Sequence, residues 1–243
     1  MRLDQALVQR QLISTRSQAG QLIKEGAVSV NGSPIKKPSF QVGEEDEIHI
    51  AKENLWVGRG AEKLAGAHAD FSLDFKDKIV ADMGASTGGF VEYSLYHGAK
   101  KVYAVDVGHD QLAQKLRDDP RVINREGTNI KNGVELEEPC DLIVVDLSFI
   151  SLTHVLEPIR ACAKENGELV ILVKPQFEVG RESLGKKGLV RDQNAVEEAL
   201  EKIKETLQGL EMELLKVSPC RVKGNKSGNQ EYFFYVRNHW RNK

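Results

Sequence analysis

The sequence predicts an α/β fold, in which a Rossmann-like sheet follows a small N-terminal α+β domain, and three observations lead to this prediction. Beyond about residue 60, short apolar runs alternate with amphipathic segments, as strands alternate with helices in α/β domains. These runs are almost continuously apolar, which is typical of parallel strands buried on both faces. The first 50 residues instead combine helical spacing with a hairpin signal.

Composition limits the classes of protein to consider. The chain has 243 residues, of which 40% are hydrophobic and 29% charged, enough for one sizeable core and a small extra domain. Unbroken apolar stretches such as Leu169–Val173 are far shorter than the roughly 18 residues of a membrane-spanning helix. The first residues also lack the apolar core and cleavage site of a secretory signal. We therefore expect a cytoplasmic protein that makes no membrane contact.

The cysteines indicate neither a disulfide framework nor a metal site. Cys140, Cys162 and Cys220 lie far apart in the sequence, and no Cys-x-x-Cys pair occurs. We expect three reduced thiols and no bound metal. The oligomeric state is not predicted by any feature of the sequence.

The net charge of −2 is unevenly distributed. Residues 1–43 carry six basic and two acidic side chains, a net charge of +4, and residues 216–243 carry seven basic and one acidic, a net charge of +6. Basic surfaces bind nucleic acids because phosphate neutralisation releases counterions, so the two basic ends favour a polyanionic partner. Charge alone is equally consistent with ordinary solvated surfaces.

The N-terminal 50 residues predict a compact helical and hairpin unit. Ser14 can cap a helix whose apolar residues recur at helical spacing, and Gly26 can end that helix in a left-handed conformation. A strand, Val28–Val30, then leads into Asn31-Gly32, a strong two-residue hairpin signal. A short closing strand is expected at Ile48–Ile50.

This segment closely resembles the S-four-type RNA-binding domain, which is named after a ribosomal protein. The resemblance rests on Arg2-Leu3-Asp4, Thr15-Arg16-Ser17 and the stretch from Gly26 to Gly32. It implies that basic side chains grip the phosphates of structured RNA. The candidate RNA contacts are Arg2, Arg16, Lys24, Lys36 and Lys37, with Arg59 added from the segment that follows.

The apolar runs of the larger region predict the strands of its sheet. Four runs should form the central strands, a long amphipathic stretch from Asn194 to about Leu210 should form a helix, and two further strands should close the chain. The expected strands are Ile79–Met83, Val102–Asp106, Leu142–Leu147, Leu169–Val173, Lys216–Cys220 and Tyr232–Val236. A glycine- and lysine-rich loop, residues 180–188, precedes the amphipathic helix. We expect an S-four-type domain at 1–53, a linker at 54–60 and the Rossmann-like domain at 61–243.

A glycine-rich turn joins the first of these strands to a helix and predicts a cofactor site. Glycines let a ligand approach the backbone, and a helix N-terminus presents free N–H groups. Ser86 stands where a dinucleotide-binding loop requires its second glycine, so nicotinamide cofactors are disfavoured. Asp82 would repel a pyrophosphate but could pair with the cationic amino-acid portion of S-adenosylmethionine. The candidate ligands here are Asp82, Gly84, Ala85, Ser86, Thr87, Gly88, Gly89 and Phe90.

Three later polar residues extend this prediction. Asp106 ends the next strand about 20 residues further on, where a carboxylate can accept hydrogen bonds from both ribose hydroxyls of an adenosine. Together with the glycine turn and the strand-terminal Asp146, it predicts S-adenosylmethionine as the cofactor. Asn129 is a candidate partner for adenine, although asparagine at a turn often has a structural role. The alternative is a tight structural turn in which Asp106 caps a helix.

Two strands end in residues suited to catalysis. Asp146 and Lys174 should both lie at the carboxyl edge of the sheet, which is where open α/β sheets bind ligands. A lysine beside a carboxylate suits alkylation of a poor nucleophile such as a ribose 2′-hydroxyl. Lys174 could be a general base if its pKa is lowered, or could stabilise a developing alkoxide if it remains charged. Both roles remain open.

With these residues in view, almost the whole chain resembles the TlyA family of ribosomal RNA 2′-O-methyltransferases, whose catalytic domain is similar to that of FtsJ-type enzymes. The matching segments are Arg59–Leu64, Asp82–Phe90, Asp146–Leu152, Lys174–Glu178 and Gly228–Tyr232. The resemblance implies a catalytic tetrad of Lys63, Asp146, Lys174 and Glu231, with Lys174 central. It also implies cytidine 2′-hydroxyls as the target, and ribosomal RNA or ribosomal subunits as the partner.

Two other functions compete with this interpretation. Members of this family have also been labelled haemolysins, but the sequence has no long apolar segment, strongly amphipathic cationic helix or lipid-facing strand pattern. A ribosome-binding or assembly factor that retains a cofactor pocket is the stronger rival. The intact tetrad favours an active enzyme.

Overall fold

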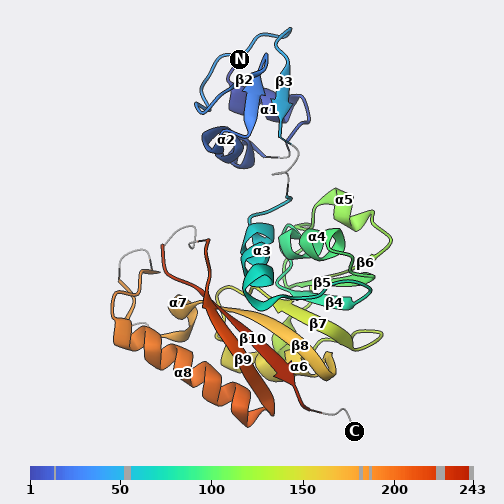
Figure 1. The fold of residues 1–243 in the computed structure, drawn as a ribbon, viewed down its shortest axis with the longest axis vertical. Helices are drawn as coiled ribbons and strands as arrows, with labels where there is room; N and C mark the ends of the chain where they lie inside the picture. Colours follow the sequence, from blue (N-terminus) through green and yellow to red (C-terminus); the bar gives the residue numbers. More distant parts are fainter. Residues whose placement is uncertain (14, 52–55, 181–182, 186–187, 223–227, 241–243) are drawn as a thin grey trace. The chain divides into compact units, whose positions relative to one another are not determined.

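The structure is a computed structural model that describes residues 1–13, 15–51, 56–180, 183–185, 188–222 and 228–240. The chain divides into two compact units, Met1–Leu55 and Trp56–Lys243 (Figure 1). Some residues considered above lie outside the described ranges. They are Ser14, residues 54–55 of the expected linker, residues 181–182 and 186–187 of the expected loop, and the basic residues Lys223, Lys226, Arg241 and Lys243.

The N-terminal unit contains two helices and a three-stranded antiparallel sheet. The order of the sheet is β2-β1-β3. Its elements are α1 (Leu3–Gln9), α2 (Arg16–Glu25), β1 (Val28–Val30), β2 (Ser33–Pro34) and β3 (Ile48–Ile50). The Asn31-Gly32 hairpin is confirmed, because both residues have a positive φ, 49° and 79°, as a tight primed turn requires. Leucine, isoleucine, valine and alanine side chains from both helices, from β1 and β3 and from the connecting segments form its core.

The end of α2 agrees with the sequence prediction, whereas its start does not. Gly26 ends the helix with φ 81°, as its sequence position predicts. The prediction of Ser14 as the N-cap is wrong, because Thr15 occupies that position and its side chain accepts a hydrogen bond from Gln18 N at 3.3 Å. Ser14 and Thr15 are both good capping residues, so sequence alone does not separate them.

The larger unit has a seven-stranded sheet in the order β6-β5-β4-β7-β8-β10-β9. Strands β4 to β8 pair in parallel, whereas β10 is antiparallel to both of its neighbours. The strands are β4 (Ile79–Met83), β5 (Lys101–Asp106), β6 (Val122–Glu126), β7 (Cys140–Val145), β8 (Ala163–Val173), β9 (Met212–Pro219) and β10 (Tyr232–Asn238). This is the Rossmann-like α/β architecture that the apolar runs predict.

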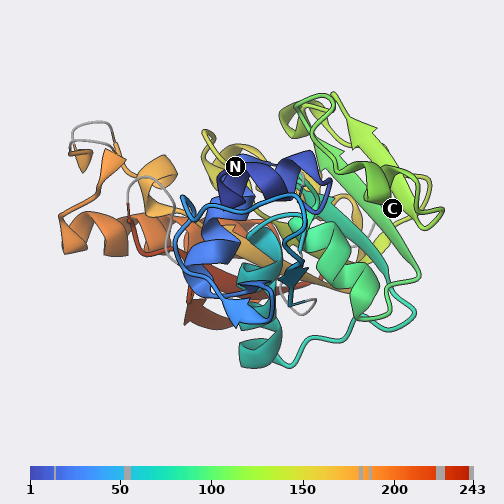
Figure 2. The ribbon, with the colours of Figure 1, turned by 90° about the horizontal axis from the view of Figure 1, so that it is seen from above.

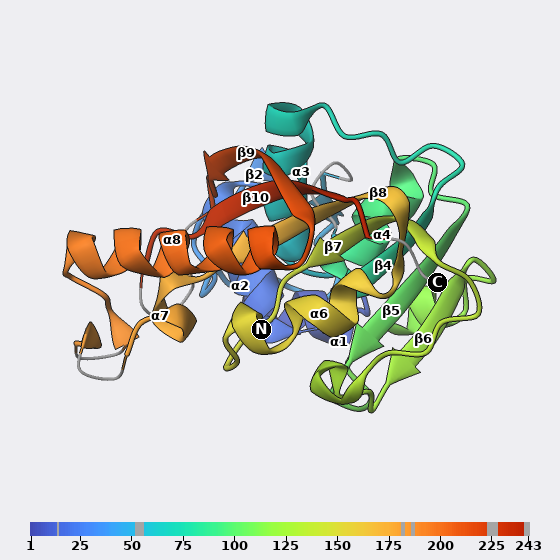
Figure 3. The same ribbon diagram turned by 90° about the horizontal axis from the view of Figure 1, so that it is seen from below.

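Helices cover both faces of this sheet. One face packs on α3 (Gly60–Phe71) and α4 (Gly89–Tyr96), and the other on α6 (Leu156–Arg160) and α8 (Gln193–Gly209). Figure 3 shows α6 and α8 in front of the strands, and Figure 2 gives the opposite view. Neighbouring residues of one strand serve different faces: Val80 packs in the first core and Ala81 in the second. The remaining short helices are α5 (Gln114–Arg117), η2 (Ile130–Asn132), η3 (Leu152–His154) and α7 (Pro175–Glu178).

Several strand bounds differ from those expected. β7 runs from Cys140 to Val145 instead of from Leu142 to Leu147, so Asp146 follows the strand directly. β8 and β9 begin earlier than their apolar runs suggest, and β10 begins at Tyr232 as expected but extends to Asn238. The three cysteines are free and buried. None of the described helices is long and apolar enough to cross a membrane.

Candidate active site

Four charged side chains from distant parts of the chain meet beside the carboxyl ends of the parallel strands. Lys63 lies near the start of α3, Asp146 follows β7, Lys174 follows β8 and Glu231 precedes β10. β10 is antiparallel to β8, and Tyr232 pairs with Val173, so the start of β10 adjoins the end of β8. This topology brings together residues separated by up to 168 positions.

The four groups form a continuous chain of ion pairs. Lys174 Nζ lies 2.5 Å from Asp146 Oδ1, and Lys63 Nζ lies 3.5 Å from Asp146 Oδ2. Lys63 also donates a hydrogen bond to Glu231 Oε2 at 2.8 Å. Lys63, Lys174 and Glu231 are buried, and Asp146 is half-buried. Buried charges cost free energy unless they are paired, so this alternation of two amines and two carboxylates is what permits their burial.

Each amine in the cluster has a different environment. Burial alone would lower the pKa of Lys63, but the carboxylates of Asp146 and Glu231 outweigh this effect, so its pKa is raised and it remains an ammonium. Lys174 has one carboxylate neighbour and donates a hydrogen bond to Ser148 Oγ at 2.9 Å. Lys63 is therefore the fixed cation that holds two carboxylates, whereas Lys174 is shared between Asp146 and a hydroxyl.

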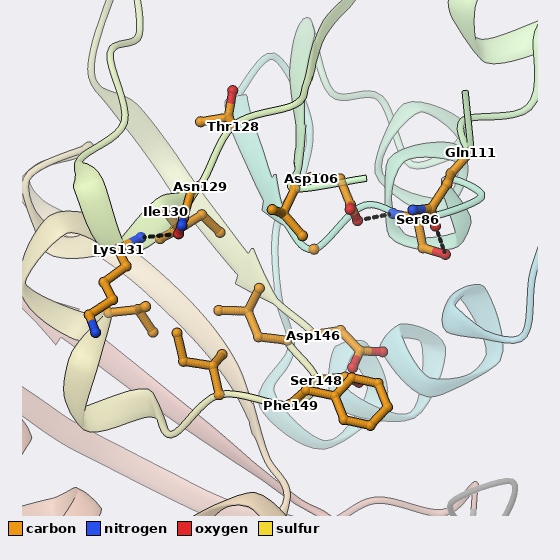
Figure 4. A pocket seen from close by; sticks show the side chains of 15 residues that line it. Ser86, Asp106, Gln111, Thr128, Asn129, Ile130, Lys131, Asp146, Ser148 and Phe149 are labelled. Carbon is orange, nitrogen blue, oxygen red and sulfur yellow. Dashed lines mark hydrogen bonds between the residues drawn. The ribbon is translucent and has the colours of Figure 1, made fainter. Parts of the chain in front are cut away.

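Two adjoining hollows surround the glycine turn. The larger has a volume of about 540 Å³ and is lined by Asp106, Asn129, Asp146 and Phe149, among others (Figure 4). The smaller, of about 320 Å³, contains Asp82 and Lys63. Gly84, Ser86 and Asp146 line both, so the two hollows meet at the turn and at the end of β7. This is the crevice at which doubly wound sheets bind ligands.

Two glycines of the turn are required by their backbone conformation and close packing. Gly84 has φ 98°, and a Cβ there would lie 2.6 Å from the carbonyl oxygen of Asp146. Gly88 has φ 95°, and a Cβ there would clash with the side chain of Leu116. Ser86, between them, also has a positive φ of 48°. The turn thus leaves its backbone open to a ligand.

The carboxyl group of Asp82 is buried, and the described residues do not satisfy its hydrogen-bonding capacity. It is 1% exposed, and neither oxygen has a hydrogen-bond partner among the described residues. Burial raises its pKa well above the usual range, the charges of Asp146 and Asp106 raise it further, and a weak interaction with the backbone N–H of Val91 offsets only part of this. A cation in the adjoining hollow would complete the site, so Asp82 fits the ammonium group of an amino acid.

Asp106 and Asn129 stand where an adenosine could be bound, and both already have structural hydrogen bonds. The two oxygens of Asp106 accept from Ser86 N at 2.8 Å and Gly108 N at 2.7 Å. The side-chain oxygen of Asn129 accepts from Lys131 N at 3.1 Å and caps η2. Each carboxylate oxygen has a second lone pair, so Asp106 can still accept from ribose hydroxyls. Figure 4 shows both residues at the edge of the larger hollow.

Sequence reasoning missed Phe149. Its ring is 90% exposed, lines the larger hollow and lies 5.2 Å from the ring of Phe177, centroid to centroid. Its backbone has φ 66°, which is strained for a bulky residue. Strain and exposed aromatic surface together are typical of functional sites. The only available signal was its position three residues after Asp146.

The expected RNA contacts fall in three places. Arg2 and Arg16 share the carboxylate of Asp4 in the N-terminal unit. Lys24 lies in the last turn of α2, and Lys36 and Lys37 follow β2. Arg59 belongs to the larger unit, where it precedes α3 and lines the smaller hollow. Among the described residues, no group of three His, Cys, Asp or Glu side chains is arranged to hold a metal ion.

Comparisons with known proteins agree with this architecture. Residues 56–238 match the FtsJ-like methyltransferase family, and residues 1–48 match the S4 domain. The chain is 41% identical to the 16S/23S rRNA (cytidine-2′-O)-methyltransferase TlyA of Mycobacterium tuberculosis over 241 residues, 97% of this chain and 89% of that protein.

Solved structures give the same result for the fold. A protein from Streptococcus thermophilus described as a hemolysin has a TM-score of 0.75 and 36% identity, covering 98% of this chain and 88% of that one. The N-methyltransferase NodS of Bradyrhizobium japonicum, solved with S-adenosyl-L-homocysteine, has a TM-score of 0.52 at 15% identity, covering 74% of this chain and 85% of that one. The second likeness concerns the fold alone.

Proposed function

Because the chain belongs to the TlyA family of FtsJ-like methyltransferases, we propose that it transfers a methyl group from S-adenosylmethionine to the ribose 2′-hydroxyl of a cytidine in ribosomal RNA. The observation that carries this proposal is the buried chain of ion pairs from Glu231 through Lys63 and Asp146 to Lys174. It adjoins two hollows whose linings suit the two ends of the cofactor.

The donor set of these hollows supports S-adenosylmethionine as the cofactor. Asp82 would pair with the ammonium of its amino-acid portion, and Gly84 and its neighbours would leave room for the backbone of that portion. Asp106 would accept from the ribose hydroxyls. Val107 and Ile130 supply apolar walls for a base in the larger hollow. The cofactor, when bound, supplies an electrophilic methyl group on a sulfonium.

The tetrad would act on the sugar oxygen that receives the methyl group. A 2′-hydroxyl is a poor nucleophile, and its proton must leave as the new C–O bond forms. Lys174 either accepts this proton as a neutral amine or, as an ammonium, stabilises the negative charge that develops on the oxygen. Asp146 holds Lys174 in position, and Lys63 and Glu231 in turn hold Asp146. Lys63, Asp146 and Glu231 are therefore proposed as positioning groups around the reacting oxygen.

The S4 domain would provide the first contact with RNA. We propose that Arg2, Arg16, Lys24, Lys36 and Lys37 contact phosphates, and that Arg59 does so beside the cofactor hollow. Phosphate contacts fix the register of an RNA without reading its sequence. The choice of nucleotide would then depend on the larger unit, in which Phe149 offers an exposed ring at the rim of the site.

The test is methyl transfer to ribosomal RNA. Ribosomal subunits and protein-free RNA from a strain lacking the gene are incubated with methyl-labelled S-adenosylmethionine and the protein, and the modified nucleotide is mapped by 2′-O-methyl-dependent primer-extension stops. Lys174→Ala should abolish transfer while calorimetry still detects binding of the cofactor. Lys164→Ala, a lysine paired with Asp141 at the far end of β8, is the matched control and should retain activity.

Two outcomes would overturn the assignment. Label that survives Lys174→Ala would remove Lys174 from the reaction. Wild-type protein that binds subunits and cofactor but transfers no methyl group would identify a binding or assembly factor instead. Lys174→Arg separates the two roles of the amine, because arginine remains charged but cannot act as a base: retained activity would favour electrostatic stabilisation.

A further inference from the structure

The first turn of α1 contains an acidic residue that binds two of the arginines proposed above. Asp4 is 5% exposed. Arg2 donates to both of its oxygens, from Nε at 2.9 Å and from Nη2 at 3.0 Å, and Arg16 Nε donates to Oδ2 at 3.0 Å. Because both arginines bind the same oxygen of Asp4, their guanidinium groups lie side by side at the junction of α1 and α2.

We propose that Asp4 is a positioning residue that holds Arg2 and Arg16 as a paired guanidinium clamp for one phosphate group of the RNA backbone. The proposal rests on the function proposed above, because it takes RNA as the ligand. It differs from a general basic surface in one respect. Here an acidic residue promotes binding of a polyanion.

The remaining donors of the pair support this inference. A guanidinium has five N–H groups in a rigid fork, and Asp4 engages two nitrogens of Arg2 and only one of Arg16. The side chains of Arg2 and Arg16 are 39% and 55% exposed, so their other N–H groups can reach a ligand. Two guanidinium groups and one carboxylate carry a net charge of +1, which a single phosphodiester neutralises. The chemistry therefore fits one phosphate.

The carboxylate is rigidly held and permanently charged. The backbone that carries it is held by two hydrogen bonds to residues outside the helix: Leu3 N donates to Phe40 O at 2.7 Å, and Asp4 N donates to Pro38 O at 3.1 Å. The hydrogen bond from Arg2 lowers the pKa of Asp4 to about 2, with burial opposing and Arg16 assisting. Asp4 is thus ionised at any physiological pH. A pair of arginines ordered in advance loses less conformational entropy when a phosphate binds.

Two simpler explanations predict different results. If Asp4 only neutralises nearby charge, its removal makes the surface more basic and strengthens RNA binding. If Asp4 only stabilises the start of α1, where acidic residues favour the helix dipole, its removal weakens the N-terminal unit whether or not the arginines are present. Of the three explanations, only the clamp predicts that removal of Asp4 weakens RNA binding and that this effect requires both arginines.

The experiment measures binding of the full-length protein to protein-free 23S ribosomal RNA as a function of salt. Asp4→Asn should weaken binding about tenfold, equivalent to about 1.4 kcal/mol, although it adds one positive charge. The same substitution in an Arg2→Ala, Arg16→Ala background should cause no further loss. KM for RNA should rise while kcat at saturating RNA stays unchanged. Glu45→Gln, which makes the same change of charge at an exposed position of the N-terminal unit, is the control for charge alone and should not weaken binding.

Two outcomes would overturn the clamp: unchanged or tighter binding by Asp4→Asn, or a further loss in the double-alanine background. If Asp4→Asn lowers the unfolding temperature of the protein, Arg2→Lys provides an independent test. Lysine keeps the charge but lacks the planar fork with which Arg2 binds both oxygens of Asp4 and still presents N–H groups to a phosphate, so binding should still fall about tenfold. If Arg2→Lys and the wild type bind RNA with equal affinity, the proposed clamp is refuted. Binding is measured without turnover, so absence of methyl transfer would refute the proposed function and leave this result standing.

Discussion

Asp82→Asn should make the protein without cofactor more stable while making it unable to bind the cofactor. The native carboxyl group is buried, and neither of its oxygens has a hydrogen-bond partner among the described residues. Burial raises its pKa well above the usual range, and the charges of Asp146 and Asp106 raise it further. A carboxyl group whose pKa is raised by folding contributes stability at low pH, and this contribution is lost as pH rises through the folded pKa. At pH 8, Asp82 therefore destabilises the empty site.

The magnitude follows from the environment of the group. Asparagine keeps the shape of the side chain and removes the charge, so it relieves about 1–2 kcal/mol of desolvation and repulsion. For a unit of this size that gain raises the unfolding temperature by about 2–8 °C. For the cofactor, the loss of one partner of a buried charge pair costs about 2–5 kcal/mol, a factor of about 30 to several thousand in affinity.

Two measurements check this prediction. Thermal unfolding without cofactor, at pH 8 and at pH 4, should show the gain at pH 8 and little difference at pH 4. Titration calorimetry with S-adenosylmethionine should show wild-type affinity falling as pH is lowered through the raised pKa, and almost no binding by the variant. Undiminished affinity of Asp82→Asn would show that no cation binds there, and a lower unfolding temperature at pH 8 would contradict the electrostatic reasoning.

Three further changes probe the rest of the site. Asp106→Ala should weaken S-adenosylmethionine binding by about 1–3 kcal/mol, and calorimetry that detects no loss would exclude a ribose contact. Gly84→Ala should lower the free energy of unfolding by about 1–3 kcal/mol and abolish cofactor binding, because φ is 98° and the new Cβ would clash with the carbonyl of Asp146. A denaturant unfolding curve with the wild-type midpoint would contradict this. Phe149→Ala should slow methyl transfer at limiting RNA, because the exposed ring at the rim of the site is lost. An unaltered kcat/KM for RNA would remove that residue from the substrate site.

The central strands could be predicted because their signal is local. Each apolar run is continuous, and Asp82, Asp106, Asp146 and Lys174 follow from their positions at or near the ends of such runs. The order of the strands could not be predicted, because pairing between distant segments leaves no local trace. β10 between β8 and β9 is the clearest case.

The details of the site also depend on distant contacts. The resemblance to a known family suggested that Lys63 and Glu231 meet, but their 2.8 Å hydrogen bond depends on where α3 and β10 pack. The positive φ of Phe149 has no compositional signal, because a phenylalanine adopts it only when the surrounding fold imposes it. The hydrogen bonds from Ser86 and Gly108 to Asp106 likewise arise from the folded turn.

The position of β10 has a consequence for biosynthesis. A ribosome makes this strand after both β8 and β9, yet it lies between them and adjoins the tetrad through Glu231. Until β10 emerges, β9 has no neighbour with which to pair, and the buried amine of Lys63 lacks one of its two carboxylates. A chain that has been synthesised only as far as β9 therefore still lacks one of the ion pairs that we propose for catalysis.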